Sequence, residues 1–413
     1  MRDSHWNLRD HCRLTRRYFY LLGGMGAAAW KASPLAALNP AAHPELRQAI
    51  ARLQYFTPVE EIKIVLDKGK AGVAQFSPER LREAGLAPES WTLEIDADPG
   101  GGSVIEAPVT LDWRGLMALA EKHAVRFPHV CVCANGADPF HMTLWEGVPL
   151  REIVWLTKPK GSIRRVRYES YHPPEARPFQ ASLPLSQVLE TAPGQMPVIL
   201  AYRMNGQLIP AGKGGPARVI VPGSYGGKLI KWVRRILLTN DYKSTDSDAE
   251  LDNDTESPLK TRARFIHVPG EVPAGMPAAL TGYAQVGVSG LAKVQYCVRS
   301  QREPWPVDDP NLTKADWKDA AILPPPSNWG GGLPGGKLPA GTKIVDPKTG
   351  QPRDWPLRHT IAHWAALIQP LAPGAYELAC RTIDLNGIAQ PMPRPFLRSG
   401  VTAIHRLALV VKA

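Results

Sequence analysis

Two kinds of hydrophobic pattern divide the chain. In the first half, helical and strand patterns alternate: Ser77-Pro78-Glu79 has the residues of a helix start, residues 91–98 alternate as a strand, and residues 111–123 carry apolar side chains at helical spacing. Between 279 and 413 the chain reads as short alternating strands, and only residues 360–368 suggest a helix. The pattern predicts an α+β region followed by an all-β region.

Changes in composition give the expected boundaries. A polar, acidic stretch predicts a surface linker, and a stretch rich in Pro and Gly predicts a long surface insertion with little regular structure. The all-β region has the size and strand pattern of an immunoglobulin-like β-sandwich. The expected segments are an export signal at 1–40, an α+β domain at 41–243, a linker at 244–270 and a sandwich at 271–413 with its insertion at 302–357.

The N-terminus has the three-part layout of a secretory signal. Arg16-Arg17 precede an apolar run at 18–30, and small residues follow at Ala36-Ala37. The run is too short to cross a bilayer, which takes about 20 apolar residues. The adjacent arginines resemble a twin-arginine signal, which indicates export to the periplasm and no membrane span. A short amphipathic helix is the alternative interpretation.

Composition and charge narrow the function classes. The 41 prolines among 413 residues argue against a largely helical protein. The formal net charge is +11 and falls to +7 without residues 1–40, and no basic tail or aromatic-studded basic motif indicates nucleic-acid binding. The five cysteines have neither the spacing of a zinc site nor that of a covalent haem site, so no haem is expected in this chain.

Several stretches in order carry a family resemblance. They are WEGVPLREI (145–153), LAYRMNGQLIP (200–210), GGPARVIVPGSYGGKLIKW (214–232) and GVTAIHRLALVV (400–411). Together they resemble the sulfite oxidase family of molybdenum-pterin enzymes over nearly all of the chain after residue 40. The resemblance implies a mixed α+β molybdopterin-binding domain followed by a β-sandwich dimerisation domain, and therefore a homodimer.

The resemblance implies one cysteine ligand to molybdenum. In the family this cysteine stands three residues before an asparagine, whereas Cys133 is two residues and Cys131 four residues before Asn135. Thiolate is a suitable soft donor for the metal. Cys133 is the preferred ligand because it lies nearer the turn, with Cys131 as the fallback. Two buried core thiols are the structural alternative.

The resemblance also implies cations for the pterin phosphate. Arg218 and Lys231 stand at the family's arginine and lysine positions, and Lys213 stands where the family has a histidine. Lys228 lies one turn before Lys231 and is expected to help. A solvated basic face is the alternative for Lys228 and Lys231.

Catalytic residues are expected on the same grounds. Tyr242 lies in a stretch similar to the family's tyrosine site, and a surface-turn tyrosine is its alternative. Arg406 lies in the C-terminal motif and His141 just beyond the cysteine turn, where a structural histidine is the alternative. Two arginine positions of the family are absent. The lysines that could replace an early one are Lys63, Lys68 and Lys70.

The expected activity is oxygen-atom transfer by an exported molybdenum enzyme. Oxidation of sulfite or a related sulfur compound, with electrons passed to a separate c-type cytochrome, is the leading hypothesis. Reduction of an S- or N-oxide is the enzymatic alternative. A pterin-binding subunit without turnover is the alternative from another class.

The export signal gives a first prediction. Replacing both Arg16 and Arg17 by lysine should leave the protein in the cytoplasm, because the twin-arginine transporter reads the paired guanidiniums. Fractionation of cells expressing the wild type and the double variant tests this. Normal export of the variant would contradict it.

Overall fold

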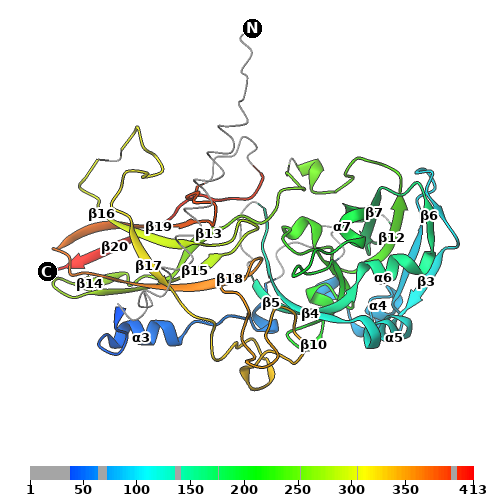
Figure 1. The fold of residues 1–413 in the computed structure, drawn as a ribbon, viewed down its shortest axis with the longest axis horizontal. Helices are drawn as coiled ribbons and strands as arrows, with labels where there is room; N and C mark the ends of the chain where they lie inside the picture. Colours follow the sequence, from blue (N-terminus) through cyan, green and yellow to red (C-terminus); the bar gives the residue numbers. More distant parts are fainter. Residues whose placement is uncertain are drawn as a thin grey trace, which may run out of the picture.

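A computed structural model describes residues 38–63, 72–134, 141–174, 176–251, 253–304, 306–391 and 398–413. Figure 1 shows two parts side by side, with the α+β region on the right and a large sheet on the left. Arg16-Arg17, Lys68, Lys70 and Asn135 lie outside the described residues.

A five-stranded sheet forms one layer of the α+β part. Leu93 and Ile95 of its first strand are fully buried, which explains the alternating pattern seen in the sequence. Strand β1 runs parallel to β12, and the other neighbouring strands of this sheet are antiparallel. In spatial order the strands are β3 (Val109–Asp112), β1 (Thr92–Ala97), β12 (Val233–Thr239), β7 (Arg165–Ser170) and β8 (Gln180–Pro184).

A second sheet carries Cys131 at the end of one strand, and its strands pair in an antiparallel manner. In spatial order they are β10 (Gln207–Leu208), β9 (Ile199–Met204), β5 (His141–Pro149) and β4 (Val125–Cys131), with β11 (Arg218–Ile220) also paired to β9. A short ribbon joins β2 (Val104–Ile105) to β6 (Pro159–Gly161).

The first predicted helix begins at its expected cap, whereas the one expected over 111–123 begins at Trp113, because Leu111 and Asp112 belong to β3. Ser77 caps α4 by accepting a hydrogen bond from the Arg80 amide at 3.2 Å, and Asp112 caps α5 by accepting from the Gly115 amide at 2.7 Å. The helices of the α+β region are α4 (Pro78–Glu83), α5 (Trp113–His123), α6 (Leu150–Val154) and α7 (Leu185–Leu189).

The second part is an eight-stranded sheet that curls around one core. Ala263, Leu280 and Trp364 from one half pack in the same cluster as Leu378 and Leu409 from the other half. In spatial order its strands are β13 (Arg262–His267), β15 (Ala278–Gln285), β18 (Ile361–Ile368), β17 (Lys318–Ile322), β16 (Lys293–Ser300), β19 (Gly374–Ile383), β20 (His405–Lys412) and β14 (Glu271–Pro273). The all-β character is as expected, while the immunoglobulin-like dimerisation role stays a prediction.

Three expectations need correction. Residues 360–368 do not form a helix: Ile361–Ile368 is β18, and its continuous apolar run reflects burial on both faces of the strand. The proposed linker at 244–270 contains β13, and its Asp246 is buried because it pairs with a buried lysine. The insertion at 302–357 contains β17, which joins the sheet.

The boundary at residue 41 also shifts. Helix α3 (Pro44–Ala51) lies beneath the large sheet in Figure 1, and its Leu46 packs against Ala279 of β15 and Ala365 of β18. An apolar stripe of the helix thus covers the other face of the sheet, opposite the core that Leu280 and Trp364 share.

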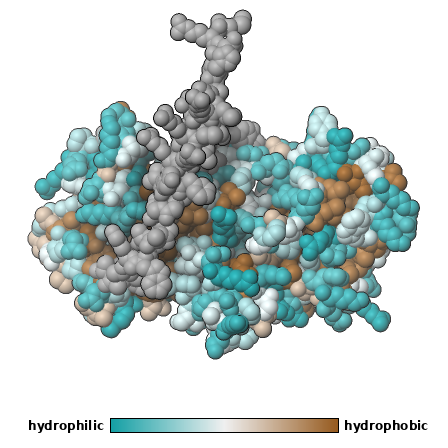
Figure 2. Space-filling model, viewed as in Figure 1, coloured by the Kyte–Doolittle hydropathy of each residue, from teal (hydrophilic) through white to brown (hydrophobic). Residues whose placement is uncertain are grey.

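Hydrophilic residues cover much of the face seen in Figure 2, and hydrophobic ones gather toward the right-hand end, over the α+β part. None of the helices within the described ranges is both long and apolar enough to cross a membrane.

The core of the large sheet gives a second prediction. A Cβ on Gly282 would lie 2.3 Å from the Arg264 carbonyl oxygen and 2.3 Å from the Trp364 ring, so Gly282→Ala should lower the free energy of unfolding by about 1–3 kcal/mol. Gly270→Ala is the matched control, because a Cβ added there would have no atom within 4 Å. Chemical denaturation measures both, and equal stabilities would refute the packing argument.

Candidate functional site

The last residue of β4 is a buried thiol. Cys131 is paired with His141 of the neighbouring strand β5, and it belongs to the same core cluster as Trp145. Burial raises the pKa of Cys131 to about 11, although the charges of Arg218 and Lys231 act in the opposite direction. The thiol is therefore held in its neutral form among core side chains.

Cys133 lies two residues beyond the strand and is partly exposed. The Gly226 amide donates a 2.9 Å hydrogen bond to the Val132 carbonyl, which brings the 226–228 turn against this cysteine. A Cβ on Gly226 would lie 3.9 Å from the Cys133 sulfur. Glycine at 226 thus leaves room beside the sulfur that a larger side chain would fill.

A buried arginine lies behind the two cysteines. Arg218 of β11 is 5% exposed, donates to the Lys213 and Leu229 carbonyls at 3.0 and 3.3 Å, and stacks its guanidinium 4.9 Å from the Trp145 ring centre. Its Nε has no hydrogen-bond partner, and no carboxylate in the described ranges contacts it. Burial lowers its pKa, as expected for a charge taken out of water without a counter-ion.

Further cations converge on the same region. Burial and then the charges of Arg218, Lys231, His129 and Lys213 push the pKa of His141 well below its usual value, so this histidine is neutral. Its Nδ1 shares a 2.7 Å hydrogen bond with the Thr143 hydroxyl.

Local backbone geometry places the lysines. Lys213 donates to the Ile62 carbonyl, and the Lys231 ammonium lies 5.6 Å from the Trp232 ring centre. Gly214 has φ = +100°, and a Cβ there would lie 2.7 Å from the Lys231 side chain, so conformation and space both require glycine. The arrangement can hold an anionic group beside a thiol.

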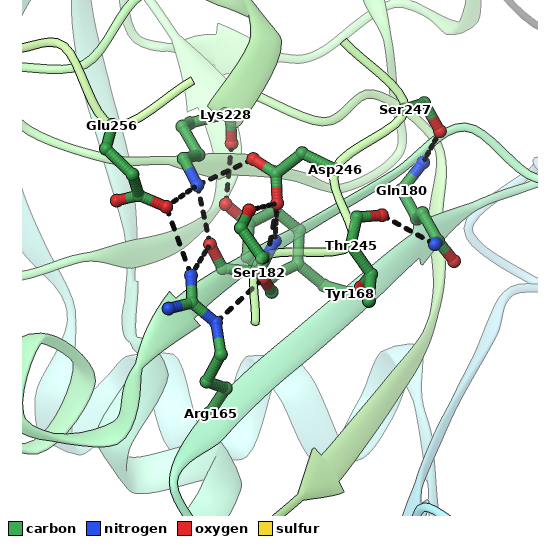
Figure 3. A network of polar contacts seen from close by, with 10 residues as sticks. Arg165, Tyr168, Gln180, Ser182, Lys228, Thr245, Asp246, Ser247 and Glu256 are labelled. Carbon is green, nitrogen blue, oxygen red and sulfur yellow. Dashed lines mark hydrogen bonds and ion pairs between the residues drawn. The ribbon is translucent and has the colours of Figure 1, made fainter. Parts of the chain in front are cut away.

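Lys228 is not part of this group. Its ammonium forms ion pairs with Asp246 at 2.6 Å and Glu256 at 3.0 Å, inside the network drawn in Figure 3. The expected role in cofactor binding is therefore corrected, because the ammonium is already neutralised by carboxylates.

Two expected catalytic residues make other contacts. Tyr242 is 69% exposed beyond β12, with the Lys243 ammonium 5.7 Å from its ring centre. Arg406 lies on β20 and donates to the Pro310 carbonyl at 2.9 Å. The structure thus brings Cys131, Cys133, His141, Arg218, Lys213 and Lys231 together, while catalytic roles for Tyr242 and Arg406 stay predictions.

Residues 81–246 match the family model described as oxidoreductase molybdopterin binding domain. The chain therefore contains a molybdopterin-binding oxidoreductase domain and resembles the sulfite oxidase family. The solved sulfane dehydrogenase SoxCD from Paracoccus pantotrophus shares this fold, with a TM-score of 0.55 and 17% identity over 78% of this chain and 76% of that chain.

Enzymes are among the relatives of this oxidoreductase. The catalytic subunit MsrP of the protein-methionine-sulfoxide reductase of Ralstonia nicotianae is 28% identical over 246 residues, 56% of this chain and 70% of MsrP. The NADPH nitrate reductase of Neurospora crassa is 30% identical over 171 residues, 36% of this chain and 16% of that enzyme. The chain thus spans less than a fifth of the length of that nitrate reductase, and 18% of the one from Beauveria bassiana.

The residues present fit a molybdenum–pterin cofactor. The buried Arg218, without an acidic partner in the described ranges, suits the pterin phosphate, as do Lys213 and Lys231 beside it. Cys133 next to Gly226 has both the room and the position for a thiolate ligand. The oxidoreductase would hold the cofactor through these residues.

Some contributors were not found from sequence. His129 accepts a 3.0 Å hydrogen bond from the Gly223 amide, and burial lowers its pKa to about 3, so it supports the glycine-rich loop as a neutral ring. Trp145 supplies the face on which Arg218 stacks. His129 lies on β4 two residues before Cys131, and Trp145 lies on β5 four residues after His141. This alternation along strands that reach the site is the sequence signal that could have pointed to them.

The two cysteines give a third prediction. Cys133→Ser should abolish turnover with the pterin retained, because a serine oxygen is a poor substitute for thiolate. Cys131→Ser should cost about 1 kcal/mol of stability and keep turnover and the metal–thiolate absorption. Turnover, pterin content and the visible spectrum measure these effects.

Cys297→Ser is the matched control. Cys297 is likewise buried, with a pKa raised to about 11 by burial, but it lies on β16 of the large sheet. If Cys131→Ser removes turnover and Cys133→Ser does not, the ligand is Cys131.

Proposed function

We propose that this oxidoreductase is an exported molybdenum enzyme that transfers an oxygen atom to or from a small sulfur compound. The observation that carries the proposal is the buried Arg218, which has no carboxylate partner in the described ranges and lies with two lysines behind the cysteine turn. A bound molybdenum cofactor would supply the two-electron oxygen-atom chemistry.

The chain's own residues would bind the cofactor and hold it in position. Arg218, Lys213 and Lys231 would hold the pterin phosphate by charge and hydrogen bonds. Cys133 would anchor the metal on the protein. His141, kept neutral by burial and by Arg218, would offer a hydrogen-bonding ring without adding a further charge.

Reduction of an S-oxide is the favoured direction. Sulfite is a divalent anion and needs a cationic pocket of its own, which Arg406 was expected to help supply. Arg406 lies on β20 of the large sheet and instead donates to the Pro310 carbonyl of the loop between β16 and β17. A sulfoxide is neutral and needs no such pocket. The likeness to the sulfoxide reductase subunit, over 70% of its length, supports the same choice.

Oxidation of sulfite or a related sulfur oxyanion is the second candidate. The positive field of Arg218, Lys213 and Lys231, which reaches both Cys131 and His141, favours it. In either direction a separate redox protein, a c-type cytochrome in our proposal, would exchange electrons with the enzyme. We also propose a periplasmic location and a homodimer built through residues 271–413.

A fourth prediction tests the function. Protein purified from a molybdate-supplied host should contain molybdenum and pterin in equal amounts. It should reduce dimethyl sulfoxide or methionine sulfoxide with a reduced dye as electron donor, faster than it oxidises sulfite with an artificial acceptor. Both rates are followed by absorbance of the dye or acceptor.

The opposite ratio of rates would favour sulfite oxidation. Protein with pterin and molybdenum but no turnover in either assay would favour a binding subunit. Arg218→Met should lose the pterin in either case, whereas Arg114→Met, an arginine on the first turn of α5, serves as control.

A further inference from the structure

The Lys228 ammonium is surrounded by oxygen atoms inside the protein. Its side chain is 3% exposed and that of Asp246 is 1% exposed. The nitrogen contacts an Asp246 carboxylate oxygen at 2.6 Å, a Glu256 oxygen at 3.0 Å and the Ser182 carbonyl at 2.7 Å. An ammonium has three hydrogens to donate, and three acceptors surround this one.

The carboxylates of Asp246 and Glu256 have further partners. The other Asp246 oxygen accepts from the Ser182 amide at 2.8 Å and from the Ser244 hydroxyl at 2.7 Å. Arg165 forms an ion pair with Glu256 at 3.1 Å (Figure 3). Burial alone would raise the pKa of Glu256, but Lys228 and Arg165 outweigh it and lower that pKa. Two cations and two carboxylates thus balance.

The same lysine fixes the turn beside the metal-ligand candidate. The Tyr168 hydroxyl donates to the Lys228 carbonyl at 2.9 Å from β7. Two residues earlier, the Gly226 amide donates to the Val132 carbonyl, next to Cys133. Gly227 between them leaves no space for a side chain, because its Cβ would lie 2.3 Å from an Asp248 oxygen. The 226–228 turn is therefore clamped between the cysteine loop and the five-stranded sheet.

We propose that Lys228 is a positioning residue for Cys133, acting through the 226–228 turn and anchored by Asp246 and Glu256. The inference rests on the proposed function, in which Cys133 holds the metal. It separates Lys228 from Lys231: the first fixes the turn through carboxylates, whereas the second is part of the cationic group. Loss of the anchor would let the turn move relative to the Cys133 sulfur and loosen the geometry of a bound metal.

Lys228→Met tests the proposal, since it keeps the length of the side chain and removes the charge. Lys158→Met is the matched control: Lys158 forms an ion pair with Glu106 at 2.6 Å, but at the surface of the same part of the protein. Lys228→Arg is the conservative variant. The readouts are hydrogen exchange of residues 223–230 in cofactor-free protein and, in the loaded enzyme, kcat, KM, pterin content and metal–thiolate absorption.

We expect exchange at 223–230 to rise at least about tenfold in Lys228→Met, and kcat to fall about 10- to 100-fold, the range seen when a group orienting a metal ligand is lost. KM and pterin content should stay near wild type, and the metal–thiolate band should shift. Lys228→Arg should restore most of kcat, and Lys158→Met should match wild type throughout.

Wild-type exchange and kcat in a folded Lys228→Met protein would overturn the proposal. Loss of pterin with unchanged exchange would also overturn it, since Lys228 would then be a direct cofactor ligand. Should Lys228→Met not fold, the double variant Lys228→Met/Asp246→Asn, which removes both charges, is measured in the same way. Absence of molybdenum from the wild type would refute the proposed function, while the exchange data would still decide whether Lys228 fixes the turn.

Discussion

The site depends on a buried positive charge that the described protein does not neutralise. Arg218 and Lys228 are ten residues apart and both almost fully buried. Lys228 is matched by Asp246 and Glu256, whereas the partners of Arg218 within the described ranges are two carbonyl groups and the Trp145 ring. A buried ion without a counter-ion costs several kcal/mol, so an arrangement of this kind is expected where an anionic ligand completes it.

The neighbouring titratable groups follow from that charge and from burial. Loss of water lowers the pKa of both His129 and His141; the next cause is the neighbouring His359 for His129 and the charge of Arg218 for His141. The same field opposes, without overcoming, the effect of burial on Cys131. The positive charge is therefore confined to Arg218 and the two lysines instead of spreading over the imidazoles, which gives an anion a defined place to bind.

The sequence predicted local structure well where chemistry is local. The cap at Ser77 and the alternating strand at 92–97 require only neighbouring residues, and both appear in the structure. Residues 360–368 were harder, because a strand buried on both faces loses its period of two and its apolar run resembles a helix.

The site was predictable where a motif reports a fixed role. Arg218, Lys213 and Lys231 lie close enough to act on the same histidine, and their role in binding the pterin stays a prediction. Lys228 does not join them, because its partners come from 246 and 256, and no spacing along the chain shows that an acidic stretch turns inward. Arg406 was misplaced for a similar reason: the motif fixes its strand but not the group, the Pro310 carbonyl, that its side chain meets.

Hydrogen bonds join the insertion at 302–357 to the strand β4. β4 is the last strand in its sheet, so its outer backbone groups need partners. The Arg126 carbonyl accepts from the Lys343 amide at 2.7 Å, and the Val130 amide donates to the His359 carbonyl at 2.9 Å. Pro128 between them has no amide hydrogen to satisfy.

Beyond the strand the same edge continues into the site. The Val132 carbonyl accepts from the Gly226 amide, so the outward groups of residues 126, 130 and 132 are bonded in turn by the insertion, the residues leading into β18 and the clamped turn. The Arg126 side chain adds a bond to the Ala340 carbonyl and an ion pair with Glu146. The all-β part therefore acts on the cysteine strand directly: it closes the edge that would otherwise be open and fixes where the strand ends and the Cys133 loop begins.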